Sequence, residues 1–246
     1  MPVKNKYHKE IIGLIKKFSV VESPDREGFG LKYVGTNKPS YHLNTKDTQM
    51  VAKEFLRKNK LSTQELHLLL DSLYYGGTYE EVNIAAKIIQ YDKELRQNIN
   101  FDKLNYWLEN VHGWAEVDTL CQMAFTSDDI LSKWGDWKKF LDKLNRNSNV
   151  HKRRASLVFL TKPVGQSADI RLSGLAFNNV NHLKQEKDIL ITKAVSWILR
   201  TLIKNHRLEV ISYLEDNSDK LPKIVVREVK SKLETGKKYI SKSKQK

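Results

Sequence analysis

An aromatic side chain and a carboxylate stand one helical turn apart in the segment Trp114-Ala115-Glu116-Val117-Asp118. If this segment is helical, residues four apart lie on one face, so Trp114 and Asp118 are neighbours. An aromatic face and a carboxylate both attract positive charge, so the pair can stabilise a cation. The same spacing also fits a half-buried tryptophan whose neighbouring aspartate pairs with an arginine. The residues alone leave both interpretations open.

Two further segments contain candidate binding residues. Lys152, Arg153 and Arg154 precede an apolar stretch at residues 157–160. Positive charge is mildly unfavourable at a helix N-terminus, which favours an external anion such as a phosphate at this position. A solvated helix end explains the same pattern. The third candidate is Trp197, which stands among apolar neighbours and, taken alone, also fits a core residue.

The charge of the chain indicates a polyanionic partner. The 246 residues contain 43 Lys and Arg against 29 Asp and Glu, a formal net charge of +14. Such an excess repels itself, and nucleic acid or an anionic membrane surface relieves that repulsion. Residues 131–162 carry nine basic and two acidic side chains, and residues 237–246 carry five lysines and no acid. We expect the Lys-rich tail at 237–246 to be flexible.

Several classes of site are excluded by residue type. Cys121 is the only cysteine, so a disulfide framework and a cysteine-based zinc site are excluded, and a reducing cytosol fits. The chain has no GxxxxGK[ST] phosphate loop and no HExxH motif, and its seven histidines are scattered. It also lacks an apolar run of the roughly 20 residues that a membrane helix needs. We therefore expect no metal, no cofactor and no membrane contact.

The elements that must position these residues are helices. Apolar residues recur at helical spacing in nearly every segment after residue 45, and no stretch alternates as a strand does. Ser62 with Glu65 and Thr78 with Glu81 predict capping boxes, Asn100 and Ser127 predict helix caps, and Pro163 predicts a helix boundary. The helices recur in pairs of roughly 35 to 45 residues, which is typical of HEAT-like repeats. We predict an all-α helical-repeat solenoid with a concave basic face.

Together the three segments resemble the AlkD-like DNA alkylation repair glycosylases. The resemblance rests on Trp114-x-x-x-Asp118, then Arg153-x-Ala155, then the Lys-Ala-x-x-Trp-x-Leu-Arg pattern of residues 193–200. Gly35-x-x-x-Pro39 is similar to the family's N-terminal turn. The resemblance spans about residues 5–236, which we expect to form one domain.

The resemblance implies a function and a set of residue roles. The family removes N3- and N7-alkylated purines from duplex DNA as metal-free, monofunctional glycosylases. By motif, Asp118 is the catalytic carboxylate, Trp114 and Trp197 line the cleft, and Arg153 holds phosphate with Lys152 and Arg154 beside it. A fixed carboxylate suits this chemistry, because the developing positive charge is on the deoxyribose. We expect a monomer located in the cytoplasm, or at the nucleoid in a prokaryote.

Two alternatives remain. A non-catalytic HEAT-like protein that binds damaged or branched DNA uses the same basic face. A protein–protein scaffold of the HEAT type is less consistent with the charge, because a scaffold has no reason to carry +14.

Overall fold

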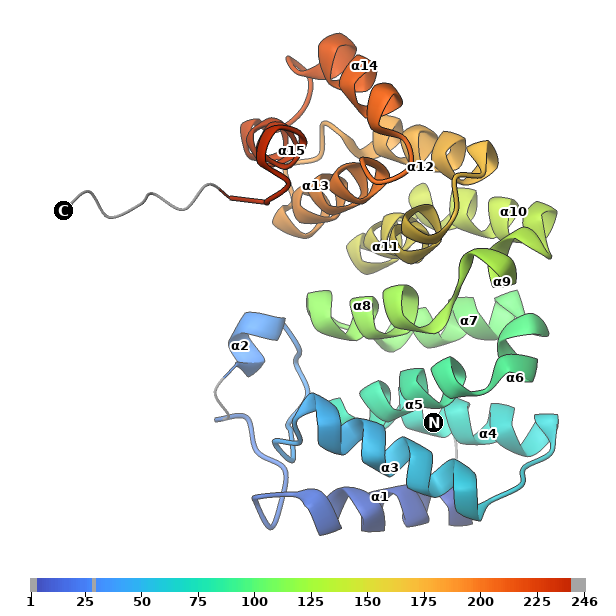
Figure 1. Cartoon of the computed structure of the whole chain (residues 1–246). Helices are drawn as coiled ribbons and strands as arrows, with labels where there is room; N and C mark the ends of the chain where they lie inside the picture. Colours follow the sequence, from blue (N-terminus) through green and yellow to red (C-terminus); the bar gives the residue numbers. More distant parts are fainter. Residues whose placement is uncertain (1–3, 28–29, 240–246) are drawn as a thin grey trace. The chain divides into compact units, whose positions relative to one another are not determined.

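The computed structural model describes residues 4–27 and 30–239. These residues contain fifteen α-helices, one short 3-10 helix and no β-strand (Figure 1). The predicted all-α fold is therefore confirmed. The internal contacts divide the chain into two compact units, Met1–Phe125 and Thr126–Lys246, here called the N-terminal and C-terminal units. Residues 240–246 of the predicted Lys-rich tail lie outside the described residues.

The N-terminal unit is built around one nearly buried helix, α5. Ten of its 13 residues are buried, because α3 and α4 pack on it and α8 packs along it. Six of the ten buried residues are apolar, and the other four are polar or charged side chains enclosed near the start and in the middle of the helix. The helices of this unit are α1 (Lys6–Phe18), α2 (Leu31–Val34), α3 (Thr45–Lys58), α4 (Thr63–Tyr74), α5 (Tyr79–Tyr91), α6 (Lys93–Gln97), α7 (Phe101–Trp107), the 3-10 helix Leu108–Asn110, and α8 (Gly113–Ala124).

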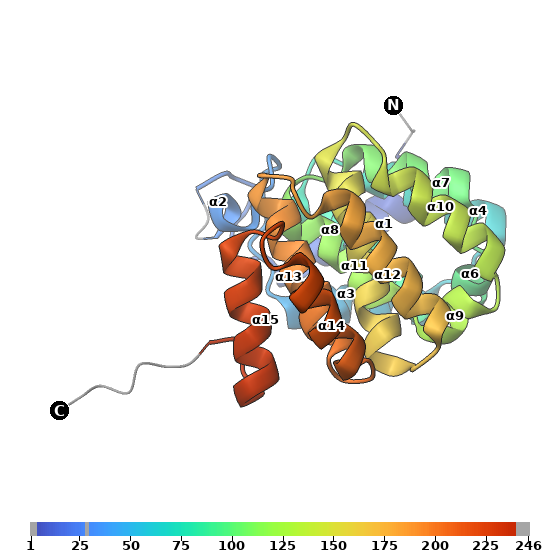
Figure 2. The same cartoon turned by 90° about the horizontal axis from the view of Figure 1, so that it is seen from above.

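The C-terminal unit has two rows of helices. In one row α13 packs between α11 and α15, and Figure 2 shows α15 beside α13. The helices α10 and α12 pack against this row and against each other, and α14 contacts α13. The helices of this unit are α9 (Ser127–Leu131), α10 (Trp134–Asn145), α11 (Val150–Gln166), α12 (Ile170–Leu183), α13 (Ile189–Leu202), α14 (Arg207–Asn217) and α15 (Lys223–Thr235).

Most of the predicted helix caps are present. Ser62 and Thr78 each form a complete capping box with the glutamate three residues on, and Asn100 caps α7. The predicted cap at Ser127 is wrong by one residue. Thr126 is the cap instead, and it forms a capping box with Asp129. Both residues carry a suitable hydroxyl, so the position of the acid three residues later decides which one caps the helix.

The predicted boundary at Pro163 is also wrong. Helix α11 continues through Pro163 and ends at Gln166. A proline lacks the N–H that bonds the preceding turn, which normally disfavours a helix interior. Here Pro163 lies in the last turn with its ring buried, beside the fully buried Val164. The apolar burial of this turn therefore offsets the lost hydrogen bond.

Candidate functional site

Helix α8 begins where two glycines let two chain segments touch. Gly113 has φ +69°, and a Cβ placed on it would lie 2.2 Å from the carbonyl oxygen of Val34. Gly35 has φ +76°, and a Cβ placed on it would lie 3.1 Å from the Cα atom of Gly113. A side chain at either position would clash or strain the backbone. The glycines thus fix α2 against the first turn of α8.

This contact holds the indole of Trp114. The indole Nε1 donates a 2.7 Å hydrogen bond to the carbonyl oxygen of Tyr33. The Tyr33 ring meets Trp114 edge-on, with ring centroids 5.3 Å apart and planes at 78°. Tyr33 is 73% exposed, so the aromatic pair is accessible to a ligand. The hydrogen bond and the ring contact together restrict the orientation of the indole.

A buried carboxylate fastens the same turn from the inside. Glu116 is fully buried and accepts hydrogen bonds from the Thr36 hydroxyl, from the backbone N–H of His112 at 2.9 Å and from Lys38 Nζ at 3.0 Å. Lys38 is also buried, and its ammonium donates to the carbonyl oxygen of Asn110 at 2.8 Å. Burial lowers the pKa of His112, and the charge of Lys38 lowers it further against the opposing effect of Glu116.

Asp118 follows Trp114 by one turn of α8. Both side chains are half-buried, whereas Ala115, Glu116 and Val117 between them are buried. The predicted arrangement of the two residues on one partly accessible face of a helix is therefore present. Because α8 is anchored at its start by Glu116 and Gly113, the backbone positions of Trp114 and Asp118 on this face are set by the helix.

In the C-terminal unit, Trp197 lies on the partly exposed face of α13. Lys193 one turn before it is exposed, and Arg200 one turn after it is half-buried. Arg200 lies 3.8 Å from the carboxylate of Glu228 on α15. Burial lowers the pKa of the Arg200 guanidinium, and the charge of Glu228 opposes that shift. Trp197 is thus a half-buried residue on a helix face that also carries Lys193 and Arg200, rather than a core residue.

The basic run on α11 is less exposed than its sequence indicates. Lys152 and Arg154 are buried, with 2% and 3% of their surfaces exposed. Arg154 donates to the carbonyl oxygen of Leu190 at 2.6 Å. Arg153 is half-buried and forms a bidentate ion pair with Glu186, with Nε to Oε1 at 2.7 Å and the second nitrogen to Oε2 at 3.0 Å. Of the three, Arg153 is the most accessible to a phosphate.

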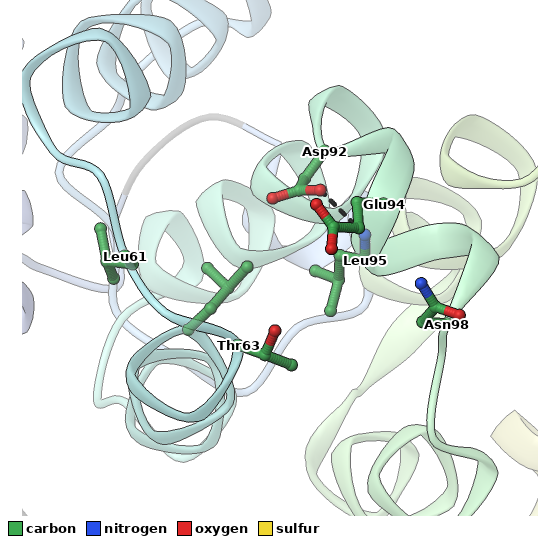
Figure 3. Close-up of a pocket in the computed structure, with 7 residues that line it drawn as sticks. Leu61, Thr63, Asp92, Glu94, Leu95 and Asn98 are labelled. Carbon is green, nitrogen blue, oxygen red and sulfur yellow. Dashed lines mark hydrogen bonds between the residues drawn. The ribbon is translucent and has the colours of Figure 1, made fainter.

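The N-terminal unit also has a small pocket of about 70 Å³ between the start of α4 and α6 (Figure 3). Its charged lining residues, Asp92 and Glu94, are both acidic. Asp92 already accepts the backbone N–H of Leu95 at 2.8 Å as a helix cap. An acidic pocket does not suit a phosphate ligand, so we assign no role in DNA binding to it.

Comparison with known proteins places the chain among the DNA alkylation repair enzymes, whose family pattern matches residues 14–233. The chain belongs to this family. A search of curated proteins found no match. Among solved structures, a predicted DNA alkylation repair enzyme from Enterococcus faecalis has a TM-score of 0.68 at 13% identity, covering 90% of this chain and 99% of that one. AlkD2 from Streptococcus mutans has a TM-score of 0.54 at 17% identity, covering 86% and 90%.

Family membership and the fold of these neighbours confirm the resemblance stated from the sequence. At 13% and 17% identity the neighbours show the fold, an AlkD-like helical repeat. The predicted roles of Trp114 and Asp118, and those of Arg153 and Trp197, stay predictions. Trp114 and Asp118 belong to the N-terminal unit, and Arg153 and Trp197 belong to the C-terminal unit.

Sequence reasoning missed the residues that support the predicted site. Tyr33, Glu116 and Glu186 were not singled out, although each contacts a residue of a predicted motif or its helix. Gly113 and Gly35 did carry a signal, because glycines before a helix and in a turn permit a close approach of backbones. Tyr33 and Glu186 lie 81 and 33 residues along the chain from Trp114 and Arg153, the residues that they contact.

Two findings concern other classes of site. Within residues 4–27 and 30–239, no group of three or more His, Cys, Asp or Glu side chains gathers as metal ligands do. Among the described helices, none has the length and apolar character needed to cross a membrane.

Proposed function

We propose that the protein is a monofunctional DNA glycosylase that removes N3- and N7-alkylated purines from duplex DNA. Membership of the DNA alkylation repair family supports an enzyme of DNA repair. The observation that carries the finer proposal is the Trp114–Asp118 pair on α8, held by the Tyr33 carbonyl and anchored by buried Glu116. The protein acts as a monomer without a cofactor, in the cytoplasm or at the nucleoid of a prokaryote.

The chemistry follows from the charge on the lesion. Alkylation at N3 or N7 makes the purine cationic and therefore a good leaving group, so little general-acid catalysis is needed. As the glycosidic bond breaks, positive charge develops on the deoxyribose. The Asp118 carboxylate stabilises this charge and orients the attacking water. Trp114 and Trp197 present aromatic faces, which favour a nearby cation. Arg153 holds a backbone phosphate.

The test is Asp118→Asn, which keeps the size of the side chain and removes its charge. Single-turnover release of free base from N7-methylguanine duplex falls by about a hundredfold or more, as for the loss of other charge-stabilising groups. Affinity for the duplex and the melting temperature change little. Asp102→Asn serves as the matched control, because Asp102 is an exposed aspartate on α7 of the same unit.

Two outcomes contradict the proposal. If activity of Asp118→Asn falls only in proportion to folded protein, Asp118 is a structural ion-pair partner. If the wild-type protein binds alkylated duplex and releases no base, the protein is the non-catalytic DNA-binding member of the family.

A further inference from the structure

The guanidinium of Arg153 uses its two edges differently. One terminal nitrogen donates to the carbonyl oxygens of Asn147 at 2.8 Å and Ser148 at 2.7 Å, in the turn between α10 and α11. The opposite edge, formed by Nε and the other terminal nitrogen, faces the carboxylate of Glu186. The backbone bonds hold the guanidinium in place whether or not Glu186 is there.

The carboxylate of Glu186 occupies the edge that a phosphate would use. Arginine binds carboxylates and phosphates in the same bidentate manner, through two parallel N–H donors. The Arg153 and Glu186 side chains are 19% and 28% exposed, so another anion can reach the pair from solvent. A carboxylate and a phosphate therefore compete for one site.

Glu186 also borders a surface cavity that other charged side chains line. It lines a surface cavity of about 470 Å³ between the loop that joins α12 to α13 and the loop that joins α14 to α15. Besides Glu186, the charged residues that line this cavity are three lysines and one aspartate, namely Lys184, Lys187, Lys220 and Asp219. Lys184 is held by the side chains of Asn181 and Asn217 at 3.0 and 2.5 Å, whereas Lys187 and Lys220 are exposed. If the Glu186 carboxylate leaves Arg153, the exposed lysines Lys187 and Lys220 of this cavity can pair with it.

We propose that Glu186 is a positioning residue that covers the phosphate-binding edge of Arg153 and exchanges places with a DNA phosphate. On binding, the phosphate takes Nε and the terminal nitrogen of Arg153 that now donate to Glu186, and the Glu186 carboxylate turns toward Lys187 and Lys220. Because the Arg153–Glu186 ion pair must break before the phosphate binds, the exchange lowers the affinity for DNA at this contact. This inference rests on the proposed role of Arg153 as a phosphate contact.

The test measures binding to a plain duplex over a range of salt for the wild type, Glu186→Gln, Arg153→Ala and the double variant. Removing the competing charge raises affinity by about two- to fivefold, the effect of one partly exposed ion pair. The gain is absent in the Arg153→Ala background, because the edge that Glu186 covers is gone. The slope of log K against log salt stays at its wild-type value in Glu186→Gln, since the number of phosphate contacts is unchanged.

Two controls separate this effect from general electrostatics and from folding. Glu215→Gln removes an exposed charge from α14 of the same unit and should leave affinity nearly unchanged. A glutamine at position 186 can still accept a hydrogen bond from Arg153, so Glu186→Ala repeats the test without that bond. Thermal melting of every variant shows whether each one is folded. Lys220→Gln weakens binding more in the wild type than in the Glu186→Gln background, because the displaced carboxylate has lost a partner.

Three results overturn the proposal. Unchanged affinity in both Glu186 variants shows that the carboxylate does not compete with DNA. An equal gain in the Arg153→Ala background shows a general charge effect. A lower melting temperature with weaker binding shows a purely structural pair. Base release is measured on the same proteins, so failure of this inference is distinguishable from failure of the proposed glycosylase function. A protein that releases no base can still show the expected differences in DNA affinity among the four proteins.

Discussion

Replacing Glu116 by glutamine tests whether the buried ion pair holds the start of α8. The carboxylate is fully buried and the Lys38 side chain is 8% exposed, with 3.0 Å between Oε2 and Nζ. Glutamine keeps the size, and its carbonyl oxygen at the position of Oε2 still accepts from the His112 N–H and from Lys38. Its amide NH2 then takes the position of Oε1 and faces the Thr36 hydroxyl, and the Lys38 ammonium lies buried beside a neutral group. Removing one partner of a buried pair costs about 3–5 kcal/mol. The retained hydrogen bonds and the Asn110 carbonyl that still accepts from Lys38 favour the lower end.

The assay is urea unfolding and thermal melting followed by circular dichroism. A loss of about 3 kcal/mol lowers the melting temperature by about 6–12 °C for a chain of this size. The double variant Lys38→Met with Glu116→Gln removes the uncompensated charge and recovers part of the loss. Glu94→Gln, at an exposed position of the same unit, changes stability by less than about 0.5 kcal/mol. A loss below about 1 kcal/mol in Glu116→Gln, without recovery in the double variant, refutes the reasoning.

Three further predictions follow from single contacts. Gly113→Ala places a Cβ 2.2 Å from the Val34 carbonyl oxygen at a positive φ, and it should lower the free energy of unfolding in urea by more than about 1 kcal/mol. Gly77→Ala is the control with a small expected effect, because a Cβ on Gly77 has nothing within 4 Å. Arg153→Ala should weaken binding to plain and alkylated duplex alike and make the salt slope shallower by about 0.9; an unchanged slope removes Arg153 from the DNA interface. Burial raises the pKa of Glu81, but hydrogen bonds from His8 and Thr78 and the charge of Lys4 outweigh it, so the net pKa lies below the ordinary 4.5. This stabilisation is present above pH 4.5 and is lost as the pH falls through the lowered pKa, and melting from pH 7 to pH 3 should show an acid limb that Glu81→Gln reduces.

The sequence predicted the helices well because their signals are local. A capping box joins residues three apart, so Ser62 with Glu65 and Thr78 with Glu81 are visible in the sequence. The two errors have different causes: at residues 126–127 two local capping signals compete, whereas at Pro163 the burial of the turn outweighs the local signal. Thr126 and Ser127 both offer a hydroxyl, and Pro163 is tolerated because its turn is buried.

The sequence alone also determined which residues are candidates for chemistry. The Trp114–Asp118 spacing, the basic run at residues 152–154 and the segment around Trp197 carried the family resemblance, and a helical period is enough to place Trp114 and Asp118 on one face. The exposure of each candidate was not predictable from its type. Lys152 and Arg154 are buried although lysine and arginine usually lie at the surface.

Only the tertiary structure decided what each candidate side chain contacts. Tyr33 reaches Trp114 across 81 residues of sequence, Lys38 reaches Glu116 across 78, and Glu186 reaches Arg153 across 33. These contacts form because helices that are distant in sequence bury their apolar faces together, and polar groups enclosed in the process must then find partners among whatever lies beside them. The periodicity of a single helix specifies which face is buried, and it carries no information about which side chain of another helix or loop will lie against that face.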